Sequence, residues 1–296
     1  MAEKLIITAA LNGTHPRKEI NPYVPYTPDE IAKAGIEAVS AGASILHIHT
    51  RSADGAVDHR AEVFVDVIKR IRERSDAVIS VTTGAGGRIS PKERIGAIVG
   101  AAEAGAAPEL GEVNLGSLDL DFIEDSGKLR FGDYIFQNTY ATVREFVDLL
   151  QSKGMKPAFA AWDAGQLANL EILLKSPGLL KAPVFLDLCY RGGQAIGGLS
   201  PSRRNLFFAV DSIQKLREYV NVVWEVIIIG MPPWELATYA ILEGGHVRVG
   251  LEDYAFMAPG KIAKGSGEMV SKVRRLAEEL GRSVATPAEA RKILGI

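Results

Sequence analysis

Two histidines stand two residues apart in the segment ILHIHTR, which is otherwise typical of a buried strand. Side chains on a strand alternate in direction, so His47 and His49 share one face of it. Two imidazoles placed in this way can bind one divalent cation, and a catalytic zinc site typically has three protein ligands and one open position. Imidazole suits zinc, iron, nickel or copper better than hard cations. The pair therefore predicts a zinc site, and the alternative is two hydrogen-bonded core histidines.

The segment HVRVGLED contains our candidate for the third metal ligand, Glu252. We expect a strand over 246–252, on which Arg248 and Glu252 share one face. The alternative is that these two residues form an inward ion pair that only fills the end of the fold. Asp253 follows the candidate ligand and could act as a general base. The alternative for Asp253 is a solvated turn residue.

Eight short runs rich in Val, Ile and Leu recur along the chain and predict strands. They lie at 4–10, 44–50, 77–83, 111–116, 156–163, 184–190, 222–229 and 246–252. Most of them are nearly continuous in apolar character, which is typical of parallel strands covered by helices on their outer face.

Helical segments fit between these strands, and several open with a Ser or Thr, a proline, and a glutamate three residues after the cap, as at Thr27 and Ser90. That pattern is the capping box. Helices are predicted over 27–42, 90–105, 200–220, 232–245 and 286–295. Eight strand–helix units predict an α/β fold of the (β/α)8 TIM-barrel type, as a single domain over 1–296 with an added C-terminal helix. A doubly wound sheet is the weaker alternative, since no GxGxxG follows the first strand and no P-loop is present.

Polar residues gather at the expected carboxyl ends of these strands, where barrel enzymes keep their chemistry. These residues are His47, His49, Arg51, Thr82, Thr83, Gly84, Glu112, Asn114, Asp163, Asp187, Arg191, Arg248, Glu252 and Asp253. The long segments 11–26 and 117–138 are expected at the same face. Trp162 is expected in the core.

The composition excludes several other classes of protein. The 296 residues carry a net charge of −2, so no overall field favours nucleic acid or a membrane surface. No signal peptide or membrane span is expected. The single cysteine, Cys189, can form neither an internal disulfide nor a cysteine metal cluster, and we expect a cytoplasmic protein.

Four segments together resemble the β-keto acid cleavage enzymes: NPYVPYTPDEIA, AGASILHIHTR, HVRVGLED and GRSVATPAEARKILG. The resemblance runs from about residue 4 to the C-terminus. It implies a zinc-dependent (β/α)8 barrel that condenses a β-keto acid with acetyl-CoA and yields acetoacetate and a new acyl-CoA. It also implies a homotetramer.

The resemblance assigns roles to individual residues. It implies that His47, His49 and Glu252 are the zinc ligands, and that Asp253 is the base and Arg248 the arginine that works with it. It further implies that Thr82, Thr83 and Gly84 help to bind the substrate carboxylate, and that Asn114 lines the site.

Two positions depart from the family members that act on an amino substrate. Where those members have glutamates, this chain has His15 in the first loop and Ala160 in the fifth strand. We expect His15 to border the substrate. The loss of two acids predicts a substrate tail that is neutral or anionic rather than cationic.

Two other functions fit part of the pattern. One is a zinc-dependent aldolase or hydrolase that does not use CoA, although five histidines are too few for a typical two-metal hydrolase. The other is a barrel that binds a metal or metabolite as a sensor or scaffold. No motif identifies the CoA-binding residues, for which Arg51 and Arg191 are the candidates.

Overall fold

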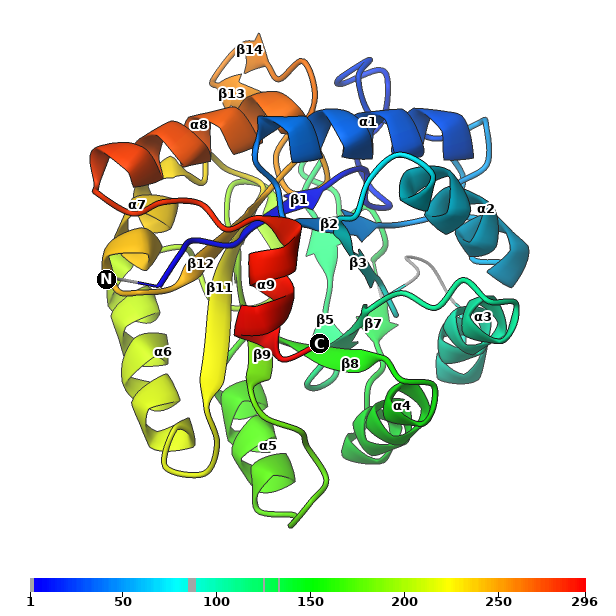
Figure 1. Ribbon diagram of the computed structural model, residues 1–296. Coiled ribbons are helices and arrows are strands. Elements are labelled where there is room, and N and C mark those ends of the chain that lie inside the picture. Colours follow the sequence, from blue (N-terminus) through cyan, green and yellow to red (C-terminus); the bar gives the residue numbers. More distant parts are fainter. Residues whose placement is uncertain (1–2, 85–88, 125, 133) are drawn as a thin grey trace.

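The computed structural model describes residues 3–84, 89–124, 126–132 and 134–296, and within them eight parallel strands close into a barrel (Figure 1). The strands are β1 (Ile7–Ala10), β2 (Ile45–Ile48), β3 (Val78–Val81), β4 (Leu110–Asn114), β8 (Lys156–Ala161), β9 (Val184–Arg191), β11 (Val222–Ile229) and β12 (His246–Val249). Each pairs in parallel with its neighbours, and β12 closes the barrel against β1. The predicted barrel is confirmed and the doubly wound alternative is wrong.

Helices surround the barrel because each strand is followed by an amphipathic segment that buries its apolar face on the sheet. They are α1 (Pro28–Ala41), α2 (Ala61–Arg72), α3 (Pro91–Glu103), α4 (Tyr140–Ser152), α5 (Ala164–Leu174), α6 (Arg203–Leu216), α7 (Trp234–Leu242) and α8 (Ser266–Glu279). The predicted capping boxes are present at Thr27 and Ser90, where each hydroxyl accepts the N–H of the third helical residue.

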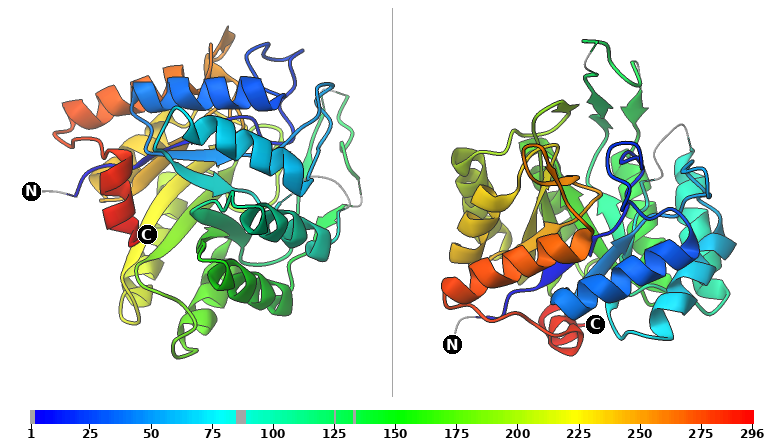
Figure 2. Two further views of the ribbon diagram at one scale, coloured as in Figure 1. Left: turned by 45° about the vertical axis from the view of Figure 1, so that its right-hand side comes forward. Right: turned by 90° about the horizontal axis from the view of Figure 1, so that it is seen from above.

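The added helix α9 (Pro287–Leu294) covers the amino-terminal end of the barrel. Its Ala290 and Leu294 are fully buried in a cluster with inward side chains that include Ile6, Phe185 and Val223. In the right-hand view of Figure 2 this helix, in red, lies at one end of the barrel, and the blue and green loops project from the other. The two ends of the barrel are therefore built differently, one as a sealed apolar base and one as an open mouth.

Short antiparallel pairs of strands build the mouth. In the long segment after β4, β5 (Leu118–Asp119) pairs with β7 (Ile135–Phe136), and β6 (Asp121–Phe122) pairs with β10 (Ala195–Ile196) from the segment after β9. A third pair joins β13 (Phe256–Ala258) to β14 (Lys261–Ile262) after β12. The predicted long loops thus lie at the carboxyl ends of the strands.

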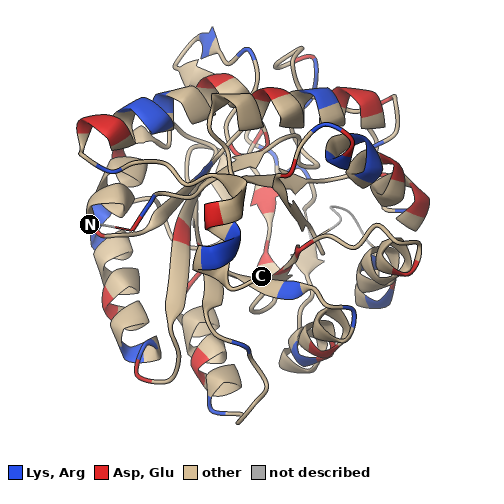
Figure 3. Ribbon diagram, in the orientation of Figure 1, with Lys and Arg blue, Asp and Glu red and all other residues tan. Residues whose placement is uncertain are grey.

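Charged residues of both signs are interspersed on the outer helices, whereas the barrel strands are mostly uncharged (Figure 3). In the described part of the chain, no helix combines the length and apolar character needed to cross a membrane.

Candidate metal centre and active site

Side chains that point into the barrel form layers, because every second residue of each strand faces inward. The lowest layer is apolar in seven of the eight strands and packs on α9. Two residues further along each strand, the next layer is mostly polar: Thr8, His47, Ser80, Glu112, Ala160, Asp187, Glu225 and Arg248. A polar layer inside a barrel is costly unless its members pair with one another or bind a ligand.

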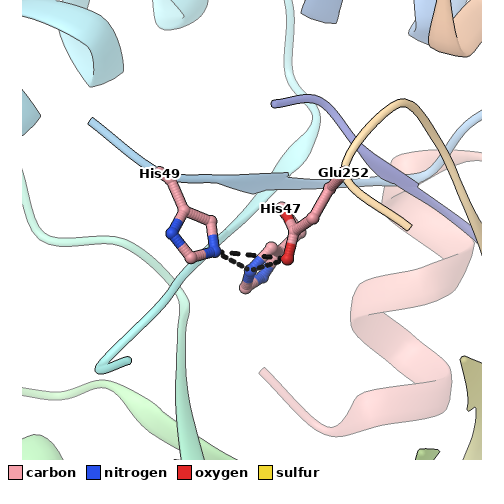
Figure 4. Close-up of side chains that lie close together, drawn as sticks. All are labelled: His47, His49 and Glu252. Carbon is pink, nitrogen blue, oxygen red and sulfur yellow. Dashed lines mark hydrogen bonds and ion pairs between the residues drawn. The ribbon is translucent and has the colours of Figure 1, made fainter. Parts of the chain in front are cut away.

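The predicted ligands His47, His49 and Glu252 converge at the top of this layer (Figure 4). The Nε2 atoms of the two histidines lie 3.3 Å apart, and Glu252 Oε1 lies 3.2 Å from His49 Nε2 and 3.7 Å from His47 Nε2. Metal–ligand bonds of about 2.1 Å in a tetrahedral site imply separations of about 3.4 Å between ligand atoms. The three atoms therefore have the spacing that one tetrahedral cation requires.

The protonation of these side chains also fits a cation. Burial lowers the pKa of His47 well below its usual value, so this imidazole is neutral and one ring nitrogen carries a lone pair. His47 Nδ1 lies 3.1 Å from Ser80 Oγ, which leaves Nε2 free to bind a metal. Despite its burial, the pKa of Glu252 is lowered well below its usual value by Arg248, His49 and His47. Glu252 Oε2 is buried without a hydrogen-bond partner among the described residues.

A turn carries Glu252 to the mouth, and the strand predicted over 246–252 ends at Val249. The chain bends because the backbone N–H groups of Asp253 and Tyr254 both donate to Gly250 O. A side chain at position 250 would collide with Ala10 O, since an added Cβ would lie only 1.8 Å from it. The strand boundary was predicted wrongly, and the ligand reaches the mouth through this turn.

Arg248 joins the carboxylates around the predicted metal site. It donates to both oxygens of Asp253, from Nε at 3.1 Å and from Nη2 at 3.0 Å. It also donates to Glu112 Oε2 at 3.1 Å and to Glu252 Oε1. Arg248 does form an ion pair with Glu252, as the alternative supposed. However, one guanidinium faces three carboxylates, and a divalent cation at the neighbouring ligands would offset the excess of negative charge.

Asp253 lies at the wall of the cavity and is 4% exposed, so the solvated-turn alternative is wrong. Burial raises its pKa to about 7, and Glu252 and Glu112 add to this shift while Arg248 opposes it. A carboxylate with a pKa near neutrality is suited to remove a proton from carbon and to return it.

A cavity of about 460 Å³ opens beside the predicted metal ligands His49 and Glu252. Four of the five residues predicted to bind substrate line it: His15, Thr82, Gly84 and Asn114. Thr83 does not line it, because its hydroxyl points away from the cavity and donates to the backbone carbonyl of Glu112. Thr82 Oγ1 accepts the N–H of Gly84 at 2.8 Å and holds the turn at the end of β3.

Several residues that were not predicted as site residues also line the cavity. Trp162 is buried in a core cluster, as expected, and it also borders the cavity, where its Nε1 donates to Asn114 Oδ1 at 2.5 Å. An aromatic wall from the segment after β4 also went unpredicted, and its members are Phe122, Phe131, Tyr134 and Phe136. Glu112 was noted only as a strand-end residue. Its place opposite Arg248 follows from the barrel register, which the sequence alone does not reveal.

The two arginines proposed for CoA differ in their surroundings. Arg51 donates from Nε to Gly55 O at 2.9 Å and from Nη1 to Pro16 O at 2.7 Å, and it stacks 4.2 Å above the ring of Tyr26. Arg51 therefore fastens loops together. Arg191 borders the cavity.

The fold and the site together define a class: a TIM-barrel enzyme whose mouth holds a His/His/Glu cluster beside a buried aspartate. The sequence profile of the beta-keto acid cleavage enzyme family matches residues 4–296. The chain belongs to this family, and it is accordingly an enzyme that cleaves a β-keto acid.

Two curated relatives match along nearly their whole length. The chain is 37% identical to 3-keto-5-aminohexanoate cleavage enzyme of Fusobacterium nucleatum, over 100% of this chain and 99% of the relative. It is 30% identical to 3,5-dioxohexanoate:acetyl-CoA acetone transferase of Paraburkholderia graminis, over 98% of this chain and 95% of the relative. Among solved structures, a ternary complex of ObcA with a C4-CoA adduct and oxalate superimposes with a TM-score of 0.73 at 19% identity, over 93% of this chain and 68% of ObcA. This last likeness concerns the fold alone.

Proposed function

We propose that the chain condenses a β-keto acid with acetyl-CoA and releases acetoacetate and a new acyl-CoA, with zinc as its metal. The observation that carries this proposal is the cluster of His47, His49 and Glu252 beside Asp253 at the wall of one cavity. The curated relative from Paraburkholderia graminis, named as an acetyl-CoA-dependent transferase, supports the choice of co-substrate.

The donor set of two imidazoles and one carboxylate favours zinc over magnesium or calcium. When bound, such an ion supplies Lewis-acid polarisation of a keto group and stabilises the negative charge that develops on its oxygen. His47, held by Ser80, and His49 would be the nitrogen ligands, and Glu252 the oxygen ligand.

In this proposal Asp253 removes the proton from the carbon between the keto and carboxylate groups. Its pKa of about 7 supports that role, and the two bonds from Arg248 hold the carboxylate in place. The carbanion then attacks the thioester carbon of acetyl-CoA and expels the CoA thiolate. The thiolate attacks the former keto carbon and breaks the bond to the acetoacetate carbon. Asp253 returns its proton to that carbon, which balances the reaction.

Thr82, Gly84 and Asn114 border the cavity and are retained as the proposed neighbours of the substrate carboxylate. Trp162 fixes the amide of Asn114 through its indole N–H. Thr83 takes no direct part in this proposal, and its role is to fasten the end of β3 to β4.

The test is an assay of acetyl-CoA consumption and acetoacetate formation with a set of β-keto acids and zinc-loaded enzyme. We expect Asp253→Asn to lose turnover by about a hundredfold or more while retaining its zinc. Asp148→Asn, which makes the same change on the exposed face of α4, is the control and should behave as the wild-type enzyme does. Cleavage of the keto acid without acetyl transfer would favour the aldolase, and normal turnover by Asp253→Asn would refute the role of this base.

We further propose that the substrate tail is neutral or anionic. His15 supports this, because burial and the nearby Arg191 and Arg130 lower its pKa to about 3 and keep it uncharged, so that it adds no negative charge. Ala160, fully buried, provides no acid either. Rates with β-keto acids that end in ammonium, methyl or carboxylate groups test this point, and a preference for the ammonium compound would contradict it.

The remaining proposals are a homotetramer and a cytoplasmic location. The family resemblance supports the first, and the single buried cysteine is compatible with the second. Sedimentation equilibrium of the purified enzyme tests the first.

A further inference from the structure

Arg191 is a buried cation whose hydrogen bonds are incomplete. It ends β9 and is only 5% exposed, with its guanidinium 4.7 Å from the ring centre of Phe122 and 5.8 Å from that of Trp162. Nη2 donates to Asp121 O at 3.2 Å, but Nε and Nη1 have no partner in the part of the chain that the structure describes. A buried guanidinium without a bonded anion is costly, and it gains most from a carboxylate that can accept two bonds.

The carboxylate of Asp121 does not supply those bonds. The carboxylate of Asp121 accepts the backbone N–H groups of Phe122, Phe131 and Gly132 at 2.7, 2.9 and 2.8 Å. Its oxygens are therefore engaged by their own loop, and only the backbone carbonyl of Asp121 reaches Arg191. Another arginine that lines the cavity, Arg130, is exposed to solvent, and its Nε lies 3.6 Å from Glu124 Oε1.

Arg191 and His15 border the same cavity as His49 and Glu252, two of the proposed metal ligands. The His15 ring stands edge-on to Phe122, with 4.6 Å between the ring centres. The cavity thus offers three kinds of contact to a ligand. The proposed metal site suits a β-keto acid group, the aromatic wall suits a short carbon chain, and the guanidinium suits a second acid group.

We propose that Arg191 binds a carboxylate at the far end of the substrate, and that the substrate is therefore a 3-oxo dicarboxylic acid. This inference rests on the proposed function, which it narrows to one class of substrate. A phosphate of CoA has the same oxyanion chemistry, so the experiment must separate the two sources.

The experiment compares two β-keto acids of six carbons, 3-oxohexanedioate and 3-oxohexanoate, which differ in their carboxylate and methyl ends. The zinc-loaded wild-type enzyme should prefer the dicarboxylate. In Arg191→Gln, kcat/KM for the dicarboxylate should fall on the order of 10- to 100-fold, as expected for the loss of hydrogen bonds to a charged group. For the methyl compound it should change less than about threefold, and KM for acetyl-CoA should stay the same.

Two further variants keep the test decisive. Arg191→Lys retains the charge without the planar pair of donors and should recover only part of the preference, even if the glutamine variant folds poorly. Arg130→Gln removes a charge from the same cavity and should reduce the preference for the dicarboxylate far less.

The proposal fails if the wild-type enzyme prefers the methyl compound, or if both Arg191 variants keep the wild-type preference. It also fails if these variants raise only KM for acetyl-CoA, which would assign the guanidinium to a phosphate. If the wild-type enzyme turns over neither acid with acetyl-CoA while cleaving other β-keto acids, the substrate class alone is wrong. If it transfers acetyl to none, the proposed function is wrong.

Discussion

Ser80 orients a proposed metal ligand from the strand next to it. The register pairs Ser80 with His47, and the hydroxyl lies 3.1 Å from His47 Nδ1. When Nδ1–H donates to this hydroxyl, the lone pair of His47 is on Nε2, which faces His49 and Glu252. Such indirect contacts commonly change metal affinity by about 10- to 100-fold.

Ser80→Ala should therefore weaken zinc binding by about 10- to 100-fold. The measurement is a competition titration of the metal-free protein against a chelator of known affinity. Ser40→Ala, on the exposed side of α1, is the matched control and should leave the affinity unchanged. An equal affinity in Ser80→Ala and wild type would show that the hydroxyl does not orient His47.

The proximity of His47 and His49 was predictable from the sequence, because their spacing along one strand puts both side chains on the same face. The contacts of Ser80 with His47 and of Glu112 with Arg248 were not predictable, because they depend on how separate strands are aligned. Thr83 does not line the cavity as predicted, because consecutive residues of an extended chain point in opposite directions and three in a row cannot all face one cavity.

At the scale of elements, β9 and β11 each bring a carboxyl group into the polar layer. Glu225 accepts the Thr8 hydroxyl at 2.6 Å, and burial raises the pKa of Glu225 to about 7. Burial and then the adjacent Glu225 raise the pKa of Asp187 well above its usual value. Both strands thus carry acids that favour their protonated form.

The stability of the metal-free protein should depend on this layer between about pH 4.5 and 7. The unfolded chain releases the Glu225 proton near the ordinary value of 4.5, whereas the folded chain keeps it until about pH 7. The stabilising contribution of protonated Glu225 is therefore complete below about pH 4.5 and is lost as the pH rises through 7.

Glu225→Gln should accordingly be more stable than wild type at pH 8, by about 1–3 kcal/mol, and nearly equal to it at pH 4.5. Denaturant unfolding at both pH values measures the difference. Glu243→Gln, an exposed change after α7, should show no such dependence. If the difference in the free energy of unfolding between Glu225→Gln and wild type does not increase with pH, folded Glu225 does not retain its proton up to neutral pH.

The base of the barrel depends on α9, whose start was predictable from its capping box at Thr286. Leu294 is fully buried there, so Leu294→Ala should lower the free energy of unfolding by about 2–5 kcal/mol. Lys292→Ala, on the exposed side of the same helix, should cost far less. Because α9 lies at the end opposite the mouth, zinc affinity should be unchanged in both variants, and a loss of zinc in Leu294→Ala would contradict this separation.

The strands and capped helices were predictable because apolar runs and capping residues act locally. The aromatic wall was not, since Phe122 lies on a short strand whose partner, β10, comes from the segment after β9, and Phe136 lies on a strand of only two residues. Strands this short carry no apolar periodicity that the sequence could reveal.

At the scale of the whole molecule, one end of the barrel provides stability and the other provides chemistry. The chemistry of the mouth depends most on the proposed metal site, where His47, His49 and Glu252 lie close together. Without a cation, Arg248 alone faces the carboxylates of Glu112, Glu252 and Asp253.

A crystal structure of the zinc-loaded enzyme, with anomalous data collected on both sides of the zinc absorption edge, tests this arrangement most directly. We predict one strong zinc peak per chain, about 2.0–2.2 Å from His47 Nε2, His49 Nε2 and a carboxylate oxygen of Glu252. The absence of a peak there in fully active enzyme, or a zinc ion bound by other residues, would show that His47, His49 and Glu252 do not form the catalytic metal site.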